Sequence, residues 1–307
     1  MLDKEKIAQD FINLFLNKKK GHLTEYVYYG EDFFGQLIKN NKNYYPYHSE
    51  IKLISDNQDL LSRTLGINKN IVEIGPGSQE SINNKTIPLI KTLQNVSSYT
   101  AIDSNLPYAQ YAAHHVQKLT GISTHEIQSS FFGKKQLVYP TDLVLILLGI
   151  TFCNTEDTHI ETFFKNTAEQ LRTNDHFIFS IDANTNPDLI NKAYNNTWLE
   201  GLAFNVFLFF KKLFNIEKFN PKLFKYKFHW HQALSEVQIY LTATEAQNFI
   251  FNNHKITIKP QQDFHIITSR KRPESFYKKI LKDNNIALIK TLEQDSDNLK
   301  IYITQAL

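Results

Sequence analysis

Short apolar runs alternate with helical patterns between residues 70 and 182, and this alternation constrains the fold more than any other feature of the chain. Such a pattern is typical of a parallel sheet whose strands are joined by crossover helices. The fourth apolar run contains no polar residue from Leu143 to Leu148, which predicts a strand in the middle of the sheet, buried on both faces. The expected strands are residues 70–74, 98–103, 124–128, 142–148 and 177–182.

The alternation stops after Asp182. The later elements are expected to be a long helix at 187–214, strands at 237–243 and 255–259, a helix at 273–283, and a closing hairpin of strands 286–292 and 299–304. We therefore expect an α/β sheet domain formed by residues 63–186 and 265–307, interrupted by an inserted α+β domain at 187–264. The amino-terminal segment 1–62 begins with an amphipathic helical pattern and is expected to join the insertion.

Composition narrows the class of protein. A chain of 307 residues with 42% hydrophobic residues is able to bury a sizeable core. Lys and Arg number 34 against 31 Asp and Glu, so the charge balance does not favour a nucleic-acid partner. Acidic residues interrupt the amino-terminal apolar stretch, and residues 202–210 are too few to span a bilayer, so neither a signal peptide nor a membrane span is expected. The single cysteine, Cys153, fits a reducing, cytoplasmic setting.

The first strand leads into a turn with two glycines, Gly75 and Gly77, and then into a helix. Glycine is needed where the backbone turns sharply and approaches a ligand. The dinucleotide fingerprint requires a third glycine, and Glu80 occupies that place, which disfavours an oxidoreductase. Asp103 closes the second strand, where a carboxylate is able to accept hydrogen bonds from both hydroxyls of a ribose. With Glu73 before the turn, the pattern predicts a site for S-adenosylmethionine (SAM).

Several further segments have the spacing of motifs found in one enzyme family. They are Tyr28-Tyr29 with Phe33-Phe34, Tyr44-Tyr45-Pro46, the turn Gly149-Ile150-Thr151-Phe152-Cys153-Asn154, Ala193-Tyr194-Asn195 and Ala203-Phe204-Asn205. On these segments the chain resembles the histidine-specific N-alpha-methyltransferases of ergothioneine biosynthesis. The resemblance implies a Rossmann-like, class I SAM-dependent methyltransferase sheet with an inserted α+β substrate-binding domain, and SAM as the cofactor.

The site residues follow from the glycine turn and from the resemblance. The expected cofactor-binding residues are Glu73, Gly75, Gly77, Ser78, Lys85, Asp103, Phe131 and Gly149. The resemblance implies that Asn154 and Tyr194 hold the carboxylate of an amino-acid substrate, with Tyr45 or its neighbour Tyr44 nearby. The hydroxyls of Tyr29 and Thr268 are the candidates for orienting the amine that is methylated, since methyl transfer mainly requires alignment of amine, methyl and sulfur.

Two departures from the family affect the substrate. Ser130-Phe131 replaces an acid-aromatic pair that faces the adenine, so only the aromatic contact carries over. The family grips imidazole with an E-x-S-x-K motif; we align it with residues 266–270, just before Arg272-Pro273-Glu274, so that Thr268 keeps the hydroxyl and Ile266 replaces the glutamate. Ile239, at another position of the expected acceptor pocket, is also aliphatic. An imidazole N–H without a partner costs about 1–3 kcal/mol, so an aromatic or apolar side chain is expected instead of histidine.

The predicted function is therefore N-methylation of the α-amine of a free amino acid or a close derivative, with that small molecule as the partner. Other readings stay open: a methyltransferase for histidine itself or for a protein side chain, or a catalytically silent SAM-fold protein that binds a partner. His229 and His231 have no third ligand in view, and no metal site is predicted.

Overall fold

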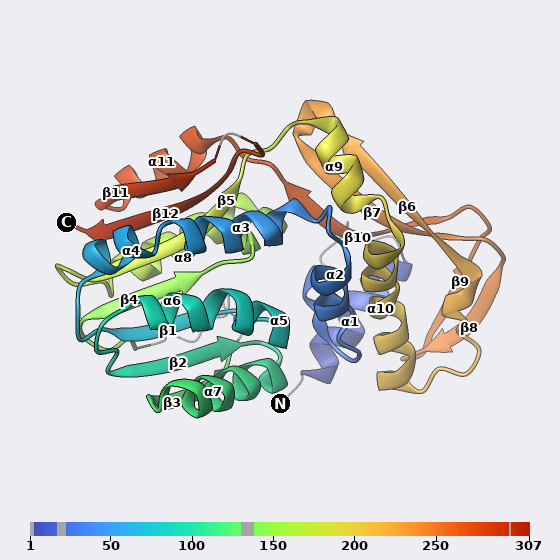
Figure 1. The fold of residues 1–307 in the computed structure, drawn as a ribbon. Coiled ribbons are helices and arrows are strands. Elements are labelled where there is room, and N and C mark those ends of the chain that lie inside the picture. The colour runs from blue at the N-terminus through green and yellow to red at the C-terminus, as the bar shows by residue number, and fades with distance from the viewer. Residues whose placement is uncertain (1–2, 17–22, 130–137, 295) are drawn as a thin grey trace. The chain divides into compact units, whose positions relative to one another are not determined.

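The computed structural model describes residues 3–16, 23–129, 138–294 and 296–307. These residues form two compact units (Figure 1). The large-sheet unit comprises Tyr44–Asn186 and Lys271–Leu307, and the small-sheet unit comprises Met1–Asn43 and Pro187–Arg270. The chain therefore passes between the units at three places, after residues 43, 186 and 270.

The large-sheet unit is built on a seven-stranded sheet in the order β11-β12-β5-β4-β1-β2-β3. Its strands are β1 (Asn70–Ile74), β2 (Ser98–Asp103), β3 (Ser123–Gln128), β4 (Leu143–Leu147), β5 (His176–Asp182), β11 (Ile286–Glu293) and β12 (Leu299–Ala306). The first five pair in parallel, whereas β12 runs antiparallel to both β5 and β11. The predicted parallel strands and the closing hairpin are thus confirmed.

Helices cover both faces of this sheet (Figure 1). They are α3 (Tyr45–Asp56), α4 (Gln58–Leu65), α5 (Gln79–Ser81), α6 (Ile87–Thr92), α7 (Leu106–Thr120), α8 (Asp157–Ala168) and α11 (Glu274–Asp283). Successive strand residues point to opposite faces. Ile71 accordingly joins a core cluster with α3, α4, α6 and α7, and Val72 joins a second cluster with α8 and α11. All of β4 is buried, as its uninterrupted apolar run predicts.

The small-sheet unit contains a three-stranded antiparallel sheet, β10-β7-β6, and the hairpin β8-β9. Its elements are α1 (Lys4–Phe15), η1 (Thr24–Tyr28), α2 (Phe33–Asn40), α9 (Pro187–Tyr194), α10 (Thr197–Phe214), η4 (Pro221–Leu223), β6 (Phe224–His231), η5 (Gln232–Leu234), β7 (Glu236–Ala243), β8 (Gln247–Phe251), β9 (His254–Ile258) and β10 (Asp263–Arg270). Aromatic rings dominate its core, and Phe11 stacks on Phe210 with ring centroids 4.1 Å apart.

The unit boundaries differ from those expected. Residues 44–62 were predicted to join the insertion, but they belong to the large-sheet unit because α3 and α4 pack Leu53 and Leu61 into its core. The insertion was expected to end at residue 264, but β10 remains paired with β7 as far as Arg270. The long helical stretch expected at 187–214 is divided into α9 and α10, because the side chain of Asn196 accepts hydrogen bonds from two backbone N–H groups and begins α10. Strands β6, β8 and β10 were not among the expected strands.

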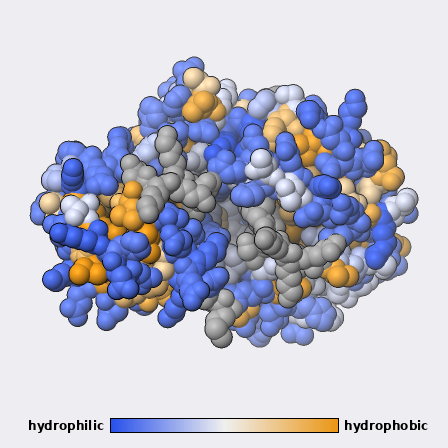
Figure 2. All heavy atoms as spheres, turned by 180° about the vertical axis from the view of Figure 1, so that it is seen from behind, coloured by the Kyte–Doolittle hydropathy of each residue, from blue (hydrophilic) through white to orange (hydrophobic). Residues whose placement is uncertain are grey.

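Hydrophilic residues cover most of the face shown in Figure 2, and hydrophobic ones form small separate areas on it. Single exposed apolar side chains such as Ile250 are normal on a protein surface. Within the residues described, no helix is both long enough and apolar enough to cross a membrane.

Candidate functional site

The turn after β1 has the backbone conformation that requires glycine. Gly75 and Gly77 have φ angles of +66° and +75°, in the left-handed region that side chains disfavour. The N–H of Gly75 donates a 2.8 Å hydrogen bond to the carbonyl of Ile102, which ties the turn to the neighbouring strand β2. A Cβ atom at Gly75 would meet no atom within 4 Å. The turn therefore presents open backbone at the carboxyl end of β1, where ligands bind in sheets of this kind.

Ser78 follows the turn and is 1% exposed. Its hydroxyl has no hydrogen-bond partner among the described residues. A buried hydroxyl without a partner costs free energy that a bound ligand recovers. Together with the open backbone at Gly75, this hydroxyl fits a polar group of SAM.

Asp103 ends β2 beside the glycine turn. One of its carboxylate oxygens accepts a 2.8 Å hydrogen bond from the N–H of Asn105. Burial raises the pKa of Asp103 to about 7, although hydrogen bonds from the backbone of Asn105, Gly77 and Ser104 act in the opposite direction. Hydroxyl donors from a ribose would favour the ionised form further, so the residue fits the predicted contact with SAM.

Glu73 lies inside the sheet unit and is 3% exposed. Its carboxylate accepts hydrogen bonds from the hydroxyls of Thr86, at 2.9 and 3.0 Å, and of Tyr99, at 2.7 Å. Burial raises its pKa above the ordinary value for glutamate. These contacts join β1 to β2 and to the π-helical turn η2 (Ile82–Thr86). Glu73 therefore holds together the elements on either side of the glycine turn.

Lys85 and Gly149 meet at one carboxylate. The Nζ of Lys85, in η2, lies 2.8 Å from Oε2 of Glu50, and the N–H of Gly149 donates a 2.6 Å hydrogen bond to Oε1 of the same residue. Lys85 also lies over the ring of Tyr47, 5.6 Å from its centroid. The structure thus brings two predicted cofactor residues together around Glu50, which the sequence did not suggest.

Asn154 ends the short helix η3 (Thr151–Asn154) after β4 and is partly buried. Arg272 holds this turn: its Nη1 donates a 2.8 Å hydrogen bond to the carbonyl of Phe152, its Nη2 donates to the carbonyl of Thr155, and its Nε donates to Asp157. Arg272 therefore fixes the backbone on both sides of Asn154.

Tyr45 is at the start of α3, and Tyr44 is the residue just before it. The hydroxyl of Tyr45 donates a 2.8 Å hydrogen bond to Asp182, at the end of β5. The same carboxylate pairs with Lys271, and both charged side chains are fully buried. The predicted substrate contact of Tyr45 therefore lies beside a buried ion pair.

Tyr29, Tyr194, Ile239, Ile266 and Thr268 belong to the small-sheet unit. Tyr29 is buried, and its ring stacks on Phe209 with centroids 5.3 Å apart. The hydroxyl of Tyr194 lies 3.5 Å from Oγ of Ser269. Thr268, which was predicted to orient the amine together with Tyr29, lies against His265 instead.

The register of β10 against β7 separates Thr268 from Ile239. Residues directly opposite each other in an antiparallel pair point to the same side of the sheet. Ile239 is opposite Ile267, and Val237 is opposite Ser269, whereas Thr268 is opposite Gln238. The hydroxyl of Thr268 lies 3.0 Å from Nε2 of His265, whose ring stacks on Tyr240.

A β-bulge at Ile266 explains the difference. The register shifts between His265 and Ile267, so one extra residue is inserted in β10. Strict alternation along the strand does not reveal such a shift. The side of the sheet with Ile239 therefore carries Ile267 and Ser269, one position later than the residues predicted from the sequence. Phe131 lies outside the described residues.

A family model described as a histidine-specific, SAM-dependent methyltransferase matches residues 7–306. The chain belongs to the histidine-specific, SAM-dependent methyltransferase family. It is 22% identical to the 4-dimethylallyltryptophan N-methyltransferase of Claviceps fusiformis over 187 residues, which are 56% of this chain and 52% of that enzyme. The match thus spans about half the length of that relative.

Two solved structures are similar to this family member over most of its length. A protein from Pyrococcus horikoshii OT3 has a TM-score of 0.50 and 9% identity, with 91% of this chain and all of that chain covered. A SAM-dependent methyltransferase from Clostridium acetobutylicum has a TM-score of 0.48 and 10% identity, with 85% and 92% covered. The predicted SAM-dependent class I fold, with SAM as the family's cofactor, is confirmed.

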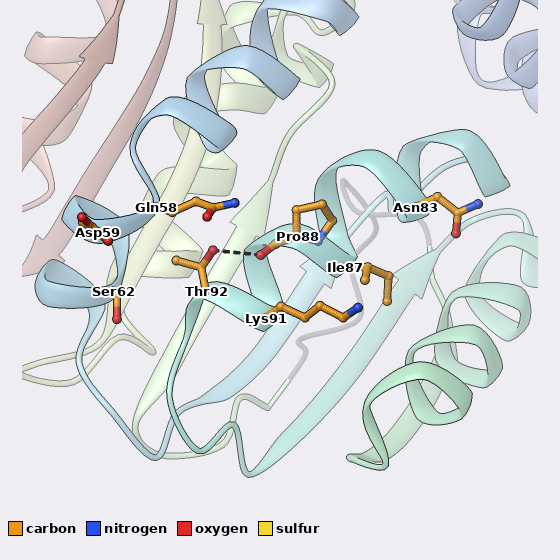
Figure 3. Close-up of a pocket in the computed structure, with 8 residues that line it drawn as sticks. All are labelled: Gln58, Asp59, Ser62, Asn83, Ile87, Pro88, Lys91 and Thr92. Carbon is orange, nitrogen blue, oxygen red and sulfur yellow. Dashed lines mark hydrogen bonds between the residues drawn. The ribbon is translucent and has the colours of Figure 1, made fainter.

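A surface hollow of about 550 Å³ lies over α4, η2 and α6 (Figure 3). Its lining residues are Gln58, Asp59, Ser62, Asn83, Ile87, Pro88, Lys91 and Thr92. None of the residues predicted for cofactor or acceptor binding in this family member contributes to it. We assign it no part in the candidate site.

The sequence analysis did not predict a role for Glu50 or Arg272, although the sequence contains a weak indication of each. Glu50 is a lone acid among the buried positions of the amphipathic helix α3, and Arg272 stands in the Arg-Pro-Glu run that served only to anchor the alignment. A buried charged side chain is normally paired, so each pointed to a partner. The identity of each partner depends on the tertiary structure and is not visible in the sequence.

Proposed function

We propose that this chain is a SAM-dependent N-methyltransferase that acts on the α-amine of a free amino acid or close derivative, with an aromatic or apolar side chain. The observation that carries the proposal is the register of β10 and β7. It groups Ile239, Ile267 and Ser269 on one side of the sheet, with Tyr194 beside Ser269. None of these residues bears a carboxylate.

The cofactor is assigned to the large-sheet unit. Bound SAM supplies a methyl group on a sulfonium, which already carries the activation for transfer. The open glycine turn, the hydroxyl of Ser78 and the carboxylate of Asp103 support its place beside β1 and β2. Lys85 and Gly149 are assigned to the same site through their shared contact with Glu50.

The acceptor carboxylate is assigned to Asn154 and Tyr194, which match the family's turn and helix. Asn154 is held by the clamp of Arg272 on its turn, and Tyr194 ends α9 with its carbonyl accepting a hydrogen bond from the hydroxyl of Tyr226. Each of them is thus fixed within its own unit. Tyr44 and Tyr45 remain further candidates for binding the acceptor carboxylate.

The amine is assigned to the hydroxyls of Tyr29 and Ser269. Ser269 replaces Thr268 in this proposal because Ser269 shares the side of the sheet that carries Ile239 and lies beside Tyr194, whereas Thr268 is on the opposite side, against His265. No strong base is required, since an amine removed from water has a lowered pKa and loses its proton more readily.

The acceptor side chain is assigned to the apolar positions Ile239 and Ile267. A histidine there would leave an imidazole N–H without a partner, at a cost of about 1–3 kcal/mol, or roughly ten- to a hundredfold in affinity. An indole or phenyl ring gains from burial at the same positions. The relative from Claviceps fusiformis is named for a substituted tryptophan, which is consistent with this choice.

Histidine is the second candidate, because the family's description names it. The two acceptors are distinguished by competition. Histidine, tyrosine, tryptophan and the other amino acids are supplied at equal concentration with SAM, and each product is identified by intact mass. We expect methylated aromatic products to dominate. A clear preference for histidine would overturn the proposed pocket, and the absence of any methylated amino acid would overturn the proposed substrate class.

A further inference from the structure

Glu50 is a fully buried carboxylate that neither the glycine motif nor the carboxylate-binding turn includes. It lies on α3, is 0% exposed, and divides its two oxygens between two partners. Oε2 pairs with Nζ of Lys85 at 2.8 Å, and Oε1 accepts the N–H of Gly149 at 2.6 Å. One side chain thus joins the π-helical turn that follows β1 to the turn that follows β4.

The turn that follows β4 lies at the carboxyl end of that strand, and the side chain of Lys85 reaches it, since its Nζ would lie 3.9 Å from a Cβ atom at Gly149. The strands β1 and β4 are parallel neighbours, with Glu73 opposite Ile146 in the register. In open α/β sheets the ligand occupies the crevice outside the carboxyl ends of the strands. Glu50 therefore binds two groups at this edge of the sheet, the ammonium of Lys85 and the N–H of Gly149.

The turn after β4 needs support because its backbone is strained. Gly149 and Ile150 are both left-handed, with φ of +82° and +50°. That conformation is uncommon for a β-branched residue and persists only where the surroundings enforce it. The N–H of Gly149 is held by Glu50, and the N–H of Ile150 is held by Oγ of Ser180.

Stability alone does not explain this arrangement. Replacing a buried ion pair with apolar residues is often neutral or stabilising, so a buried pair contributes little net stability. A carboxylate that accepts one backbone N–H and one ammonium does, however, fix their positions relative to each other. A π-helical turn, the element that presents Lys85, is itself frequent at functional sites.

We propose that Glu50 is a positioning residue for the SAM site, holding the Lys85 ammonium and the Gly149 backbone in the geometry that binds the cofactor. This inference rests on the proposed cofactor site. It adds α3 to the elements that form the SAM site, through a side chain that is itself fully buried.

The test measures the affinity of the full chain for S-adenosylhomocysteine by calorimetry. Glu50→Gln keeps a side-chain oxygen that accepts the Gly149 N–H but removes the charge that pairs with Lys85, so affinity should fall about tenfold. Glu50→Ala removes both contacts and should weaken binding about a hundredfold. In a Lys85→Met background, Glu50→Gln should have little further effect, because the pair is already broken.

Ser49→Ala is the matched control. Ser49 is the neighbouring residue of α3, is also buried, and donates a hydrogen bond to Asp297. Loss of this hydroxyl should lower the melting temperature without changing the affinity by more than about twofold, since its hydrogen bond goes to Asp297 and not to Lys85 or Gly149.

The outcomes separate the two proposals. If the unmodified chain does not bind S-adenosylhomocysteine, the cofactor site and this inference both fail. If it binds, and Glu50→Gln and Glu50→Ala bind equally well, Glu50 is structural and the inference alone fails. Should Glu50→Ala not fold, Glu50→Gln decides the question. In steady state, the KM for SAM should rise in Glu50→Gln while the KM for the acceptor stays unchanged.

Discussion

The Oγ of Ser269 lies 3.5 Å from the hydroxyl oxygen of Tyr194, although the two residues are 75 positions apart in the sequence. The neighbouring hydroxyl, Thr268, is opposite Gln238 and lies against His265. Two adjacent hydroxyl residues therefore face different surroundings, which provides a matched pair for mutation.

Ser269→Ala should raise the KM for the acceptor about tenfold, because it removes a hydroxyl beside Tyr194 that we assign to the substrate. Thr268→Ala should change that KM by less than about twofold. Steady-state kinetics with the best acceptor found in the amino-acid screen would measure both. The reverse order of the two variants would restore the alignment expected from the sequence.

Ile267→Glu should shift the preference among acceptors toward histidine. A carboxylate at this position supplies the acceptor that an imidazole N–H lacks, and it disfavours an apolar ring because its charge would be buried without a partner. Competition between histidine and tryptophan at equal concentration measures the shift as a ratio of products. Ile266→Glu, at the bulge, is the comparison variant. A larger shift from Ile266→Glu would contradict the register argument.

Cofactor affinity should depend on pH through Asp103. Burial raises its pKa to about 7, so below that pH the carboxylate is increasingly protonated and accepts hydrogen bonds poorly. The affinity for methylthioadenosine, which has the ribose hydroxyls but no group that titrates near neutral pH, should therefore fall by up to about tenfold per pH unit below 7. Asp103→Asn should flatten this dependence, and an unchanged slope in that variant would assign the titration to another group.

The same pKa shift affects the stability of the unliganded protein. Because the folded pKa of Asp103 exceeds the ordinary value of 3.8, the unfolded chain releases this proton first as the pH rises, and the carboxyl group lowers stability progressively from about pH 4 to pH 7. Without ligand, Asp103→Asn should thus melt at a higher temperature than the unmodified chain at pH 8, and the gap should close near pH 4. Calorimetric scans at the two pH values measure it.

Arg272→Met should impair acceptor use more than cofactor binding. Losing the clamp frees the backbone on both sides of Asn154, so the KM for the acceptor should rise about tenfold while the affinity for S-adenosylhomocysteine stays within about twofold. Arg272→Lys should recover only part of the loss, because lysine lacks the planar fork that reaches two carbonyls. Lys279→Met, which removes an exposed pair with Asp283 on α11, is the control. Equal effects of all three variants would refute a role for the clamp.

The central strands of the sheet were predictable from the sequence because they are buried on both faces. Runs such as Leu143 to Leu147 are apolar at every position, so the pattern survives without knowledge of the neighbours. The glycine turn and Asp103 were predictable for a similar reason, since a sharp turn and the end of a strand are local features.

The proposed acceptor pocket was harder to predict from the sequence. A bulge displaces the register by one residue, and the amino-acid sequence of β10 does not show whether Ile266 or Ile267 is the extra residue. The partners of Glu50 were hidden because Lys85 and Gly149 are distant in sequence, and a buried ion pair has no periodic pattern. The boundary after residue 43 was missed because α3 has the same amphipathic character as the helices before it.

The carboxylate of Asp182 has a consequence for recombination between relatives. It accepts hydrogen bonds from Tyr45 and Lys271, which are the second and the first residue after two of the three chain crossings. Its own strand leads to the third crossing, after Asn186. Exchanging the small-sheet unit for that of another family member requires three cuts. A chimera cut after residues 43, 186 and 270 keeps Tyr45, Asp182 and Lys271 within one parent. Cuts placed a few residues later would take the partners of Asp182 from the other parent, and a partner without a positive charge at position 271 would leave its carboxylate buried without a counterion.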